Sequence, residues 1–403
     1  MSTQYDMIIV GGGAAGFFTA INIAEKNPKF KIAILERGKE VLTKVRVSGG
    51  GRCNVTHACF EPNELVKHYP RGEKELRGPF HVFGTGDTIA WFEKRGVILK
   101  TEADGRMFPV TDSSQTIIDC FLNETKKYGI DVLTGQSVQS IFKNGQVWKI
   151  DSQNQNYSCS KLILATGSNP KVWNLLAESF HHNIIEPVPS LFTFNIKDSR
   201  IINLPGVSAL ATVKIMGTKL ESNGPLLITH WGMSGPAILK LSAWGARLLF
   251  EKKYKFSISV NWLDHMSFED AENNLRQLRL AQPKKAVSGK SPFEIPNRLW
   301  ESMVVASGIS PELKWADVSK SHIQKLATEL TQAQYSVDGK STFKEEFVTA
   351  GGIDLKEINF KTMESKIHEN LYFAGEIVNI DAITGGFNFQ NAWTSGFIVA
   401  ASI

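Results

Sequence analysis

Met-Ile-Ile-Val-Gly-Gly-Gly-Ala-Ala-Gly, residues 7–16, decides the fold of this chain. The apolar stretch runs directly into the spacing Gly11-x-Gly13-x-x-Gly16, and an apolar pattern near helical spacing continues over residues 14–26. With this spacing, Gly11 permits a tight turn, Gly13 lets the backbone approach a pyrophosphate, and Gly16 lets the helix lie close to the strand. Free N–H groups and the positive end of the helix then face the phosphates. The stretch therefore predicts a dinucleotide-binding site.

The next apolar strand, residues 31–35, ends at Glu36. A carboxylate at this point can accept hydrogen bonds from a ribose hydroxyl, and it would repel a 2′-phosphate. The strand, glycine turn, helix and acidic residue together make the prediction much more specific than the glycines alone. The motif leaves open whether the dinucleotide is NAD or FAD.

Length and composition describe a globular chain with more than one domain. A chain of 403 residues is longer than one ordinary hydrophobic core supports, so two or three domains are expected. Lys and Arg concentrate modestly at residues 247–255 and 276–290. We interpret both segments as solvated faces, because the net charge of +5 is small for this size. The expected partner is a small-molecule substrate and not a nucleic acid.

The chain shows no sign of secretion or membrane insertion. Its N-terminal apolar stretch is only a strand long and lacks a basic region, so no signal peptide is expected. No apolar run approaches the ~20 residues that a membrane-spanning helix needs. The chain has only four cysteines, which do not form a disulfide framework. The expected location is cytoplasmic.

The pattern of elements changes twice along the chain. Strand and helix patterns alternate at both ends, whereas the middle carries first short alternating apolar runs and then a polar helical pattern. The simplest interpretation is an α/β, Rossmann-like domain formed by residues 1–189 and 345–403. Into it are inserted a β-rich domain, residues 190–265 with part of 331–344, and a small helical domain, residues 266–330.

A second glycine-rich stretch, Ser-Gly-Gly-Gly-Arg-Cys-Asn, occupies residues 48–54. Three consecutive glycines indicate a close backbone approach, with a flexible loop as the alternative. Arg52 could supply charge to a phosphate or an anionic substrate, which makes it a candidate catalytic residue. Lys44 could reach the same anion or could be an ordinary surface lysine.

Cys53 and Cys59 suggest a redox pair, which we do not favour. Five residues separate them, a longer spacing than in the flavin disulfide reductases. A catalytic disulfide would also need an NAD(P)H domain with its own glycine fingerprint, and the sequence after Gly167 is not one. Both cysteines are expected to be inert or merely exposed thiols.

A third motif near the C-terminus combines residues 374–376, Asp381 and the stretch Thr-Gly-Gly-Phe-Asn at residues 384–388. Its two adjacent glycines let the chain approach a flat ring system. The helix expected from Asn388 would direct its N-terminus at the bound group, where the helix dipole stabilises the negative charge of a reduced flavin. Glu376 or Asp381 could bind a ribityl chain. A capped terminal helix after a glycine turn is the alternative.

His230 is a candidate proton donor, because histidine titrates near neutral pH and this one precedes a glycine turn. A hydrogen-bonded structural histidine is the alternative. The nine histidines show no convincing ligand spacing, so no metal site is expected.

These motifs together resemble the HI0933-like (YhiN/BaiN-type) family of FAD-dependent flavoproteins, which are NAD(P)/FAD-dependent oxidoreductases. The resemblance runs from residue 7 to residue 396. The similar segments are GGGAAG at 11–16, SGGGRCN at 48–54, ADGRMFP at 103–109, LATG at 164–167, THWGMSGP at 229–236 and YFAGEIVNIDAITGGFNFQNAWTSG at 372–396.

The resemblance implies bound FAD in a fold of the two-dinucleotide-binding-domain type, with an inserted β-domain and a smaller helical domain. Gly11 and Gly16 of the glycine turn belong to the expected cofactor site, and Val138 is the expected backbone partner of the adenine. The other implied FAD contacts are Gly13, Ala15, Glu36, Arg37, Lys44, Gly51, Thr166, Gly167, Gly375, Glu376, Asp381, Gly386, Phe387 and Asn388.

The resemblance also implies an oxidoreductase that transfers hydride through flavin N5 between NAD(P)H or a small organic substrate and an acceptor. Two chemistries stay open: NAD(P)H-dependent reduction of an activated C=C bond or carbonyl, and oxidation of a small amine such as aminoacetone with release of hydrogen peroxide. Without a second glycine fingerprint, NAD(P)H would bind only transiently in the flavin cleft. A flavin-binding protein with a structural role or a role in RNA modification is the alternative of another class. A strong basic stripe would favour that alternative, and the sequence does not show one.

Overall fold

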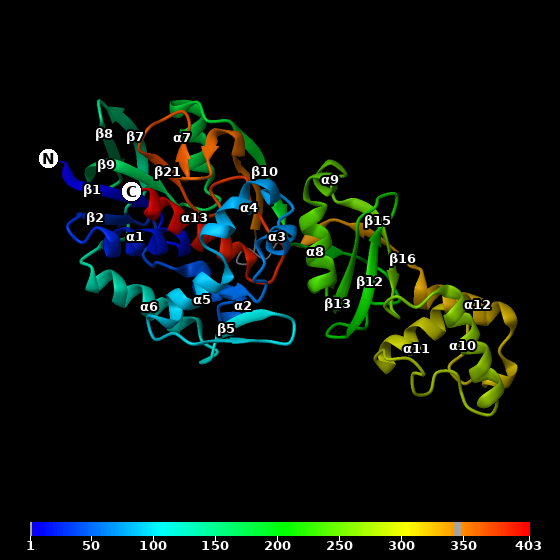
Figure 1. Cartoon of the computed structure of the whole chain (residues 1–403). Helices are drawn as coiled ribbons and strands as arrows, with labels where there is room; N and C mark the ends of the chain where they lie inside the picture. The colour runs from blue at the N-terminus through cyan, green and yellow to red at the C-terminus, as the bar shows by residue number, and fades with distance from the viewer. Residues whose placement is uncertain (1, 342–347) are drawn as a thin grey trace. The chain divides into compact units, whose positions relative to one another are not determined.

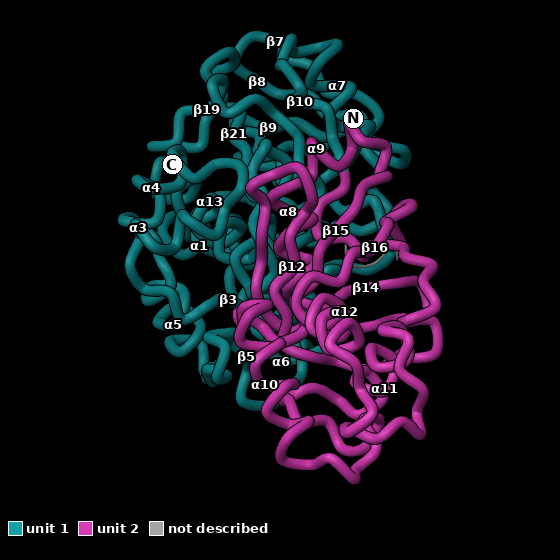
Figure 2. The backbone as a smooth tube through the Cα atoms, turned by 90° about the vertical axis from the view of Figure 1, so that its right-hand side faces the viewer, with its two compact units in different colours: residues 1–188, 344–403 teal, residues 189–343 magenta. Residues whose placement is uncertain are grey.

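The computed structural model describes residues 2–341 and 348–403. The chain forms two compact units, the first made of residues 1–188 and 344–403 and the second of residues 189–343, which Figure 2 shows in two colours. The chain therefore leaves the first unit once and returns to it. The domain boundary expected at residue 345 lies outside the described residues.

The first unit is built on a mixed sheet with a parallel centre (Figure 1). In spatial order its strands are β19 (Ile358–Asn359), β20 (Glu364–Ser365), β21 (Leu371–Phe373), β9 (Asn156–Leu164), β1 (Thr3–Val10), β2 (Ile32–Leu35) and β6 (Asp131–Leu133), with β8 (Val147–Ser152) pairing both β9 and β7 (Val138–Asn144). β1 runs parallel to β2 and β9, so Val10 lies beside Leu35 and Leu164. The carboxyl ends of these three strands consequently meet at one edge.

Two apolar helices, α1 (Ala14–Lys26) and α13 (Phe387–Ser402), pack against each other in the first unit. A Cβ atom on Gly396 would lie 2.7 Å from Thr19 Oγ1, so glycine permits this close approach. The rings of Phe18 and Trp393 lie 5.3 Å apart across the contact. The helix predicted over residues 14–26 is confirmed, and α13 begins one residue before the predicted Asn388.

The remaining elements of the first unit surround the sheet. β10 and β18 pair where the chain leaves this unit and returns to it. The helices are α2 (Thr43–Gly51), α3 (Pro62–Leu65), α4 (Glu73–Val82), α5 (Thr85–Glu93), α6 (Ser114–Lys127), α7 (Pro170–Phe180) and the short η1 (Val66–His68) and η3 (Leu355–Glu357), and the strands are β3 (Thr56–His57), β4 (Leu99–Thr101), β5 (Arg106–Pro109), β10 (Ile184–Ser190) and β18 (Val348–Ile353).

The second unit combines a sheet with two sets of helices. In spatial order the strands are β16 (Ala333–Asp338), β15 (Lys255–Asn261), β12 (Ser208–Ile215), β13 (Glu221–Thr229), β14 (Gly232–Ser234), β11 (Thr193–Asn195) and β17 (Lys340–Ser341). The helices are α8 (Pro236–Trp244), α9 (Ala246–Glu251), α10 (Phe268–Ala281), α11 (Asn297–Ala306), η2 (Trp315–Asp317) and α12 (Lys320–Thr331). The segments expected to form a β-rich domain and a helical domain thus belong to one compact unit.

Candidate cofactor site

The turn between β1 and α1 requires glycine at two positions and is open at a third. A Cβ on Gly11, whose φ is +116°, would lie 2.3 Å from the carbonyl oxygen of Ala165. A Cβ on Gly16 would lie 2.0 Å from the carbonyl oxygen of Gly11. Around Gly13, by contrast, a Cβ would meet nothing within 4 Å. The N-terminus of α1 therefore has free space beside its backbone, which is where a dinucleotide phosphate would lie.

A pocket of about 220 Å³ opens beside this turn, at the carboxyl ends of β1, β2 and β9. Ligands of open parallel sheets bind at such an edge. Five of the predicted cofactor residues line the pocket, although they come from four separate stretches of sequence. They are Gly11, Glu36, Arg37, Val138 and Thr166.

Glu36 is held in place by two backbone groups of the loops that surround it. Its Oε2 accepts a hydrogen bond from Gly12 N at 2.8 Å, and its Oε1 accepts one from Gly38 N at 2.7 Å. Each carboxylate oxygen can accept more than one hydrogen bond, so both can still receive a ribose hydroxyl. The side chain is therefore oriented toward the pocket before any ligand binds.

Sequence reasoning missed Asn169 and Lys171, which also line this pocket. Asn169 caps α7, with Oδ1 accepting a hydrogen bond from Lys171 N at 3.1 Å, and Pro170 occupies the first turn. An Asn-Pro pair after a buried strand is a helix-start signal that could have revealed this position. Lys171 places a positive charge at the pocket rim, where it can attract an anionic ligand.

Removal of the Glu36 carboxylate should weaken FAD binding selectively. Because hydrogen bonds to charged groups contribute about 1.5–3 kcal/mol, we expect Glu36→Ala to raise the Kd of FAD at least tenfold. Fluorescence titration of the apoprotein with FAD measures this change. Glu40→Ala removes the same charge from an exposed position nearby and should leave the Kd unchanged. Equal Kd values for the two variants would contradict the assigned role of Glu36.

The glycine-rich stretch lies at the end of α2, where the helix is interrupted, because Ser48, Gly49 and Gly50 have non-helical backbone angles. Gly49, Gly50 and Gly51 all have left-handed φ values, from +58° to +84°, which favour glycine strongly. Cβ atoms on Gly50 and Gly51 would meet nothing within 4 Å. The chain therefore presents an open stretch of backbone here, as a close approach to a ligand requires.

The structure brings a second group of predicted residues together around the start of α1. A Cβ on Gly375 would lie 2.9 Å from the Cβ of Ala15, and one on Gly167 would lie 3.8 Å from an oxygen of Glu376. Glu376 forms an ion pair with Lys44 at 2.7 Å, and this carboxylate raises the pKa of Lys44. Four stretches from different parts of the sequence thus meet at one place.

Arg52 lies in a cluster of charges on the surface of the first unit. Its Nη1 is 2.6 Å from Glu102 and 3.6 Å from Asp112, and its guanidinium lies 4.0 Å from the centre of the Phe108 ring. These contacts fix the side chain in one position. A bound anion would have to compete with two carboxylates, so the catalytic role of Arg52 stays a prediction.

The turn before α13 leaves no room for a side chain at Gly386. A Cβ on Gly386, with φ of +94°, would lie 2.6 Å from Thr56 O. The side chain of Asn388 closes the turn, since its Oδ1 accepts from Ala382 N at 3.0 Å and its Nδ2 donates to Ala382 O at 3.2 Å. Asn388 therefore shapes the backbone at the N-terminus of α13.

Phe387 forms a three-ring cluster with two histidines that sequence reasoning did not select. The ring centre of Phe387 lies 4.6 Å from that of His57 and 4.2 Å from that of His68, and both pairs are stacked. Tyr69 donates a hydrogen bond to the carbonyl oxygen of Phe387 at 2.6 Å. The motif Val-Lys-His-Tyr at residues 66–69 gives no signal of this contact, because it depends on folding alone. The cluster brings two titratable rings to the start of α13.

Asp381 is completely buried and pairs with Arg71, whose side chain is 14% exposed. Two guanidinium nitrogens face the two carboxylate oxygens, in the fork geometry that makes such pairs strong. The role of Asp381 as a cofactor ligand stays a prediction. In the structure, its evident partner is Arg71, a residue that sequence reasoning passed over.

His230 lies at an exposed turn of the second unit, between β13 and β14. Its role as a proton donor stays a prediction. Cys53 and Cys59 are free thiols, and burial raises the pKa of the Cys53 thiol to about 12. Cys53 is therefore protonated at neutral pH and is a poor nucleophile.

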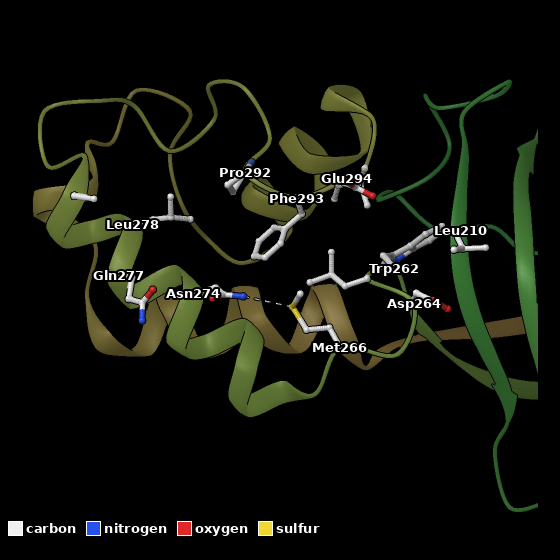
Figure 3. A pocket seen from close by; sticks show the side chains of 13 residues that line it. Leu210, Trp262, Asp264, Met266, Asn274, Gln277, Leu278, Pro292, Phe293 and Glu294 are labelled. Carbon is white, nitrogen blue, oxygen red and sulfur yellow. Dashed lines mark hydrogen bonds between the residues drawn. The ribbon is translucent and has the colours of Figure 1, made fainter.

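A larger hollow of about 700 Å³ lies within the second unit. Figure 3 shows Phe293, Met266 and Leu278 lining it, with Asp264 and Glu294 near one end. Among the described residues, no cluster of three His, Cys, Asp or Glu side chains could hold a metal ion. The helices of the described part are also too short or too polar to cross a membrane.

The fold and the family match place this chain among the FAD-dependent oxidoreductases. The HI0933-like protein Rossmann domain family matches residues 5–402, so this chain belongs to the HI0933-like family.

Two relatives match almost the whole chain. The ribosomal RNA dihydrouridine synthase of Escherichia coli is 28% identical and aligns over 99% of this chain and 98% of its own length. The 3-dehydro-bile acid delta(4,6)-reductase of Clostridium scindens is 26% identical over 97% of each chain. A 3-ketosteroid-delta4-(5alpha)-dehydrogenase from Rhodococcus jostii has a similar structure, with a TM-score of 0.52, 14% identity and coverage of 99% of this chain and 97% of that one.

Proposed function

We propose that this protein reduces a carbon–carbon double bond conjugated to a carbonyl group, using FAD and electrons from NAD(P)H. The names of the two relatives denote this chemistry in different substrates. A dihydrouridine is uridine with two hydrogens added to its ring double bond, and a 3-oxo delta(4,6) compound carries double bonds conjugated to its ketone. In both, the carbonyl accepts the electron density that hydride addition creates. The two relatives share a type of reaction although their substrates differ, and it is this type of reaction that we propose for the present chain.

We further propose uridine in ribosomal RNA as the substrate. The observation that carries this choice is the alignment with the Escherichia coli synthase over 99% of this chain and 98% of that protein. The proposal replaces our expectation from net charge that no nucleic acid is a partner. That expectation averaged the charge over all 403 residues, and an average conceals an uneven distribution.

The residues of the first unit fit FAD. The open backbone at Gly13 and the N-terminus of α1 would receive the pyrophosphate, and Glu36 would bind the ribose of the adenosine. The N-terminus of α13 would stabilise negative charge on the ring system. When bound, FAD would accept hydride from NAD(P)H and pass it, as reduced flavin, to the substrate.

Reduction of the double bond also needs a proton on the second carbon. His57 and His68 belong to the same unit as the predicted cofactor residues, and they cluster at the first residue of α13. We propose His57 and His68 as candidate proton donors in addition to His230, because imidazole exchanges protons near neutral pH. Tyr69 is less suited, since burial raises its pKa well above the usual range.

Anaerobic flavin reduction followed by product analysis tests the proposal. We expect NADH or NADPH to bleach the flavin of the purified holoprotein. Unmodified ribosomal RNA transcript should then restore the oxidised spectrum and yield dihydrouridine, which mass spectrometry of the digested RNA detects. A steroid enone and aminoacetone form the two comparison arms.

Each arm has a distinct meaning. Turnover of the enone without turnover of RNA would keep the reaction type and overturn the RNA substrate. Bleaching by aminoacetone, with hydrogen peroxide formed in air, would replace the reductase by an oxidase. A preparation that contains FMN or no flavin would contradict the proposed use of FAD.

A further inference from the structure

The net positive charge of this protein comes from the second unit. Residues 189–343 contain 19 Lys and Arg but only 13 Asp and Glu, a net charge of +6. The rest of the chain contains 26 basic and 27 acidic residues, a net charge of −1. The modest total of +5 therefore describes neither unit. A large polyanion such as RNA would therefore be attracted more strongly to the second unit than to the first.

Within the second unit, residues 240–255 concentrate this charge. They contain five basic residues and one acidic residue, Glu251. The basic residues are Lys240, Arg247, Lys252, Lys253 and Lys255. We call residues 240–255 the basic–aromatic surface, because large aromatic side chains are exposed on the same segment.

The aromatic side chains lie on two consecutive short helices. Trp244 ends α8 and is 43% exposed, and Phe250, on α9, is 39% exposed. Lys240 precedes Trp244 by four residues, a spacing that puts both on one face of α8. The other side of α8, with Ala237, Ile238 and Leu241, is buried. This face of α8 thus carries one half-buried cation, Lys240, and one exposed indole ring, Trp244.

The turn after α9 presents its lysines at a conformational cost. Lys253 and Tyr254 have φ values of +54° and +58°, in the left-handed region that favours glycine. Backbone hydrogen bonds hold the turn, from Lys253 N to Phe250 O at 2.8 Å and from Tyr254 N to Leu249 O at 2.9 Å. Lys255 pairs with Asp338 at 3.3 Å, whereas Lys252 and Lys253 are exposed and take part in no ion pair within the described part of the chain. Their ammonium groups are therefore available to an external anion.

We propose that the basic–aromatic surface binds the ribosomal RNA substrate, with its lysines on the phosphates and Trp244 stacked on an unpaired base. This inference rests on the proposed function and names where the RNA docks. Interleaved cations and exposed aromatic rings are the combination that single-stranded nucleic acid requires. The hollow of Figure 3 does not suit RNA, because Asp264 and Glu294 line it and would repel phosphates.

The role of the basic–aromatic surface can be tested with a fluorescein-labelled, single-stranded RNA of mixed sequence. Fluorescence anisotropy measures its binding over a range of salt concentrations. The first variant is Lys252→Ala with Lys253→Ala. It should weaken binding about tenfold at moderate salt, and the loss of two phosphate contacts should reduce the slope of log K against log salt by about 1.4. The second variant, Trp244→Ala, should weaken binding about tenfold with the slope unchanged, because stacking releases no counterions.

Lys284→Ala with Lys285→Ala is the matched control. It removes two adjacent exposed lysines from the same unit, so the change in net charge is identical, but these residues lie outside the basic–aromatic surface. The control should bind RNA as the wild type does, with an unchanged slope. Flavin content and melting temperature of every variant show whether the fold is intact.

The outcomes separate this proposal from the proposed function. If the Lys252 and Lys253 variant binds like the control, the surface is wrong, whether or not the enzyme makes dihydrouridine. If the wild-type protein fails to bind RNA, the surface is wrong as well, and the enone arm then decides the reaction type. If RNA binds at this surface but no uridine is reduced, the docking site stands and the proposed substrate does not.

Discussion

Gly13→Ala is expected to abolish most FAD binding while leaving the fold intact. Gly13 has φ of −96° and ψ of −170°, which alanine adopts without strain, and a Cβ there would meet no protein atom within 4 Å. The new methyl group would occupy the space that the pyrophosphate needs. Overpacking costs typically about 1–3 kcal/mol, so the Kd of FAD should rise by up to about 100-fold. Titration of the apoprotein with FAD measures the change.

Gly16→Ala, three residues further on, should behave in the opposite way. Its Cβ would lie 2.0 Å from the carbonyl oxygen of Gly11, so the turn cannot form without a backbone shift. We expect the melting temperature of the apoprotein to fall, with FAD binding lost as a consequence of unfolding. If Gly13→Ala lowers the melting temperature as much as Gly16→Ala, or if it binds FAD normally, the phosphate is not where we place it.

Arg71→Met is expected to cause a large loss of stability in the first unit. It leaves the completely buried carboxylate of Asp381 without its guanidinium. Removal of one partner of a buried ion pair costs about 3–5 kcal/mol. Thermal unfolding of the apoprotein, followed by circular dichroism, measures the effect. Arg71→Met combined with Asp381→Asn should recover part of the loss, because the second change removes the buried charge.

Lys67→Met provides the control for this experiment. Lys67 pairs with Glu64 at 2.7 Å, but both side chains are about 60% exposed. Exposed pairs contribute about 0–1 kcal/mol, so this variant should unfold like the wild type. If Arg71→Met keeps its stability and instead loses affinity for FAD, Asp381 is part of the cofactor site, as the sequence motif suggested.

Prediction from sequence succeeded where the constraint is local. The helix over residues 14–26 follows from an apolar pattern that a single segment carries, and α13 follows from the apolar segment after a glycine turn. The glycines at positions 11 and 16 are required by contacts within one βα turn and the strand beside it. The Gly16 requirement is local, because its contact is with Gly11. The contact of Gly11 with Ala165 is not local, and Gly11 was found from the spacing of the motif.

Prediction was incomplete where distant segments meet. Glu36 was selected, but Lys171 on the rim of the same pocket was not, since nothing near residue 171 shows that β9 lies beside β1. At residues 48–54 the sequence left a close backbone approach and a flexible loop open. The structure extends α2 to Gly51, but Ser48, Gly49 and Gly50 have non-helical backbone angles.

By itself, the sequence determined the glycine turn after the first strand. Backbone passes so close to residues 11 and 16 that only glycine fits there, and this requirement appears in the sequence as the glycine spacing. Only the tertiary structure decided that His57 and His68 cluster on Phe387 and that Arg71 neutralises Asp381, because those pairs are hundreds of residues apart. The structure also showed that the second unit carries a net charge of +6. Net charge is a sum over the chain, whereas the attraction of an anion depends on where the charges lie.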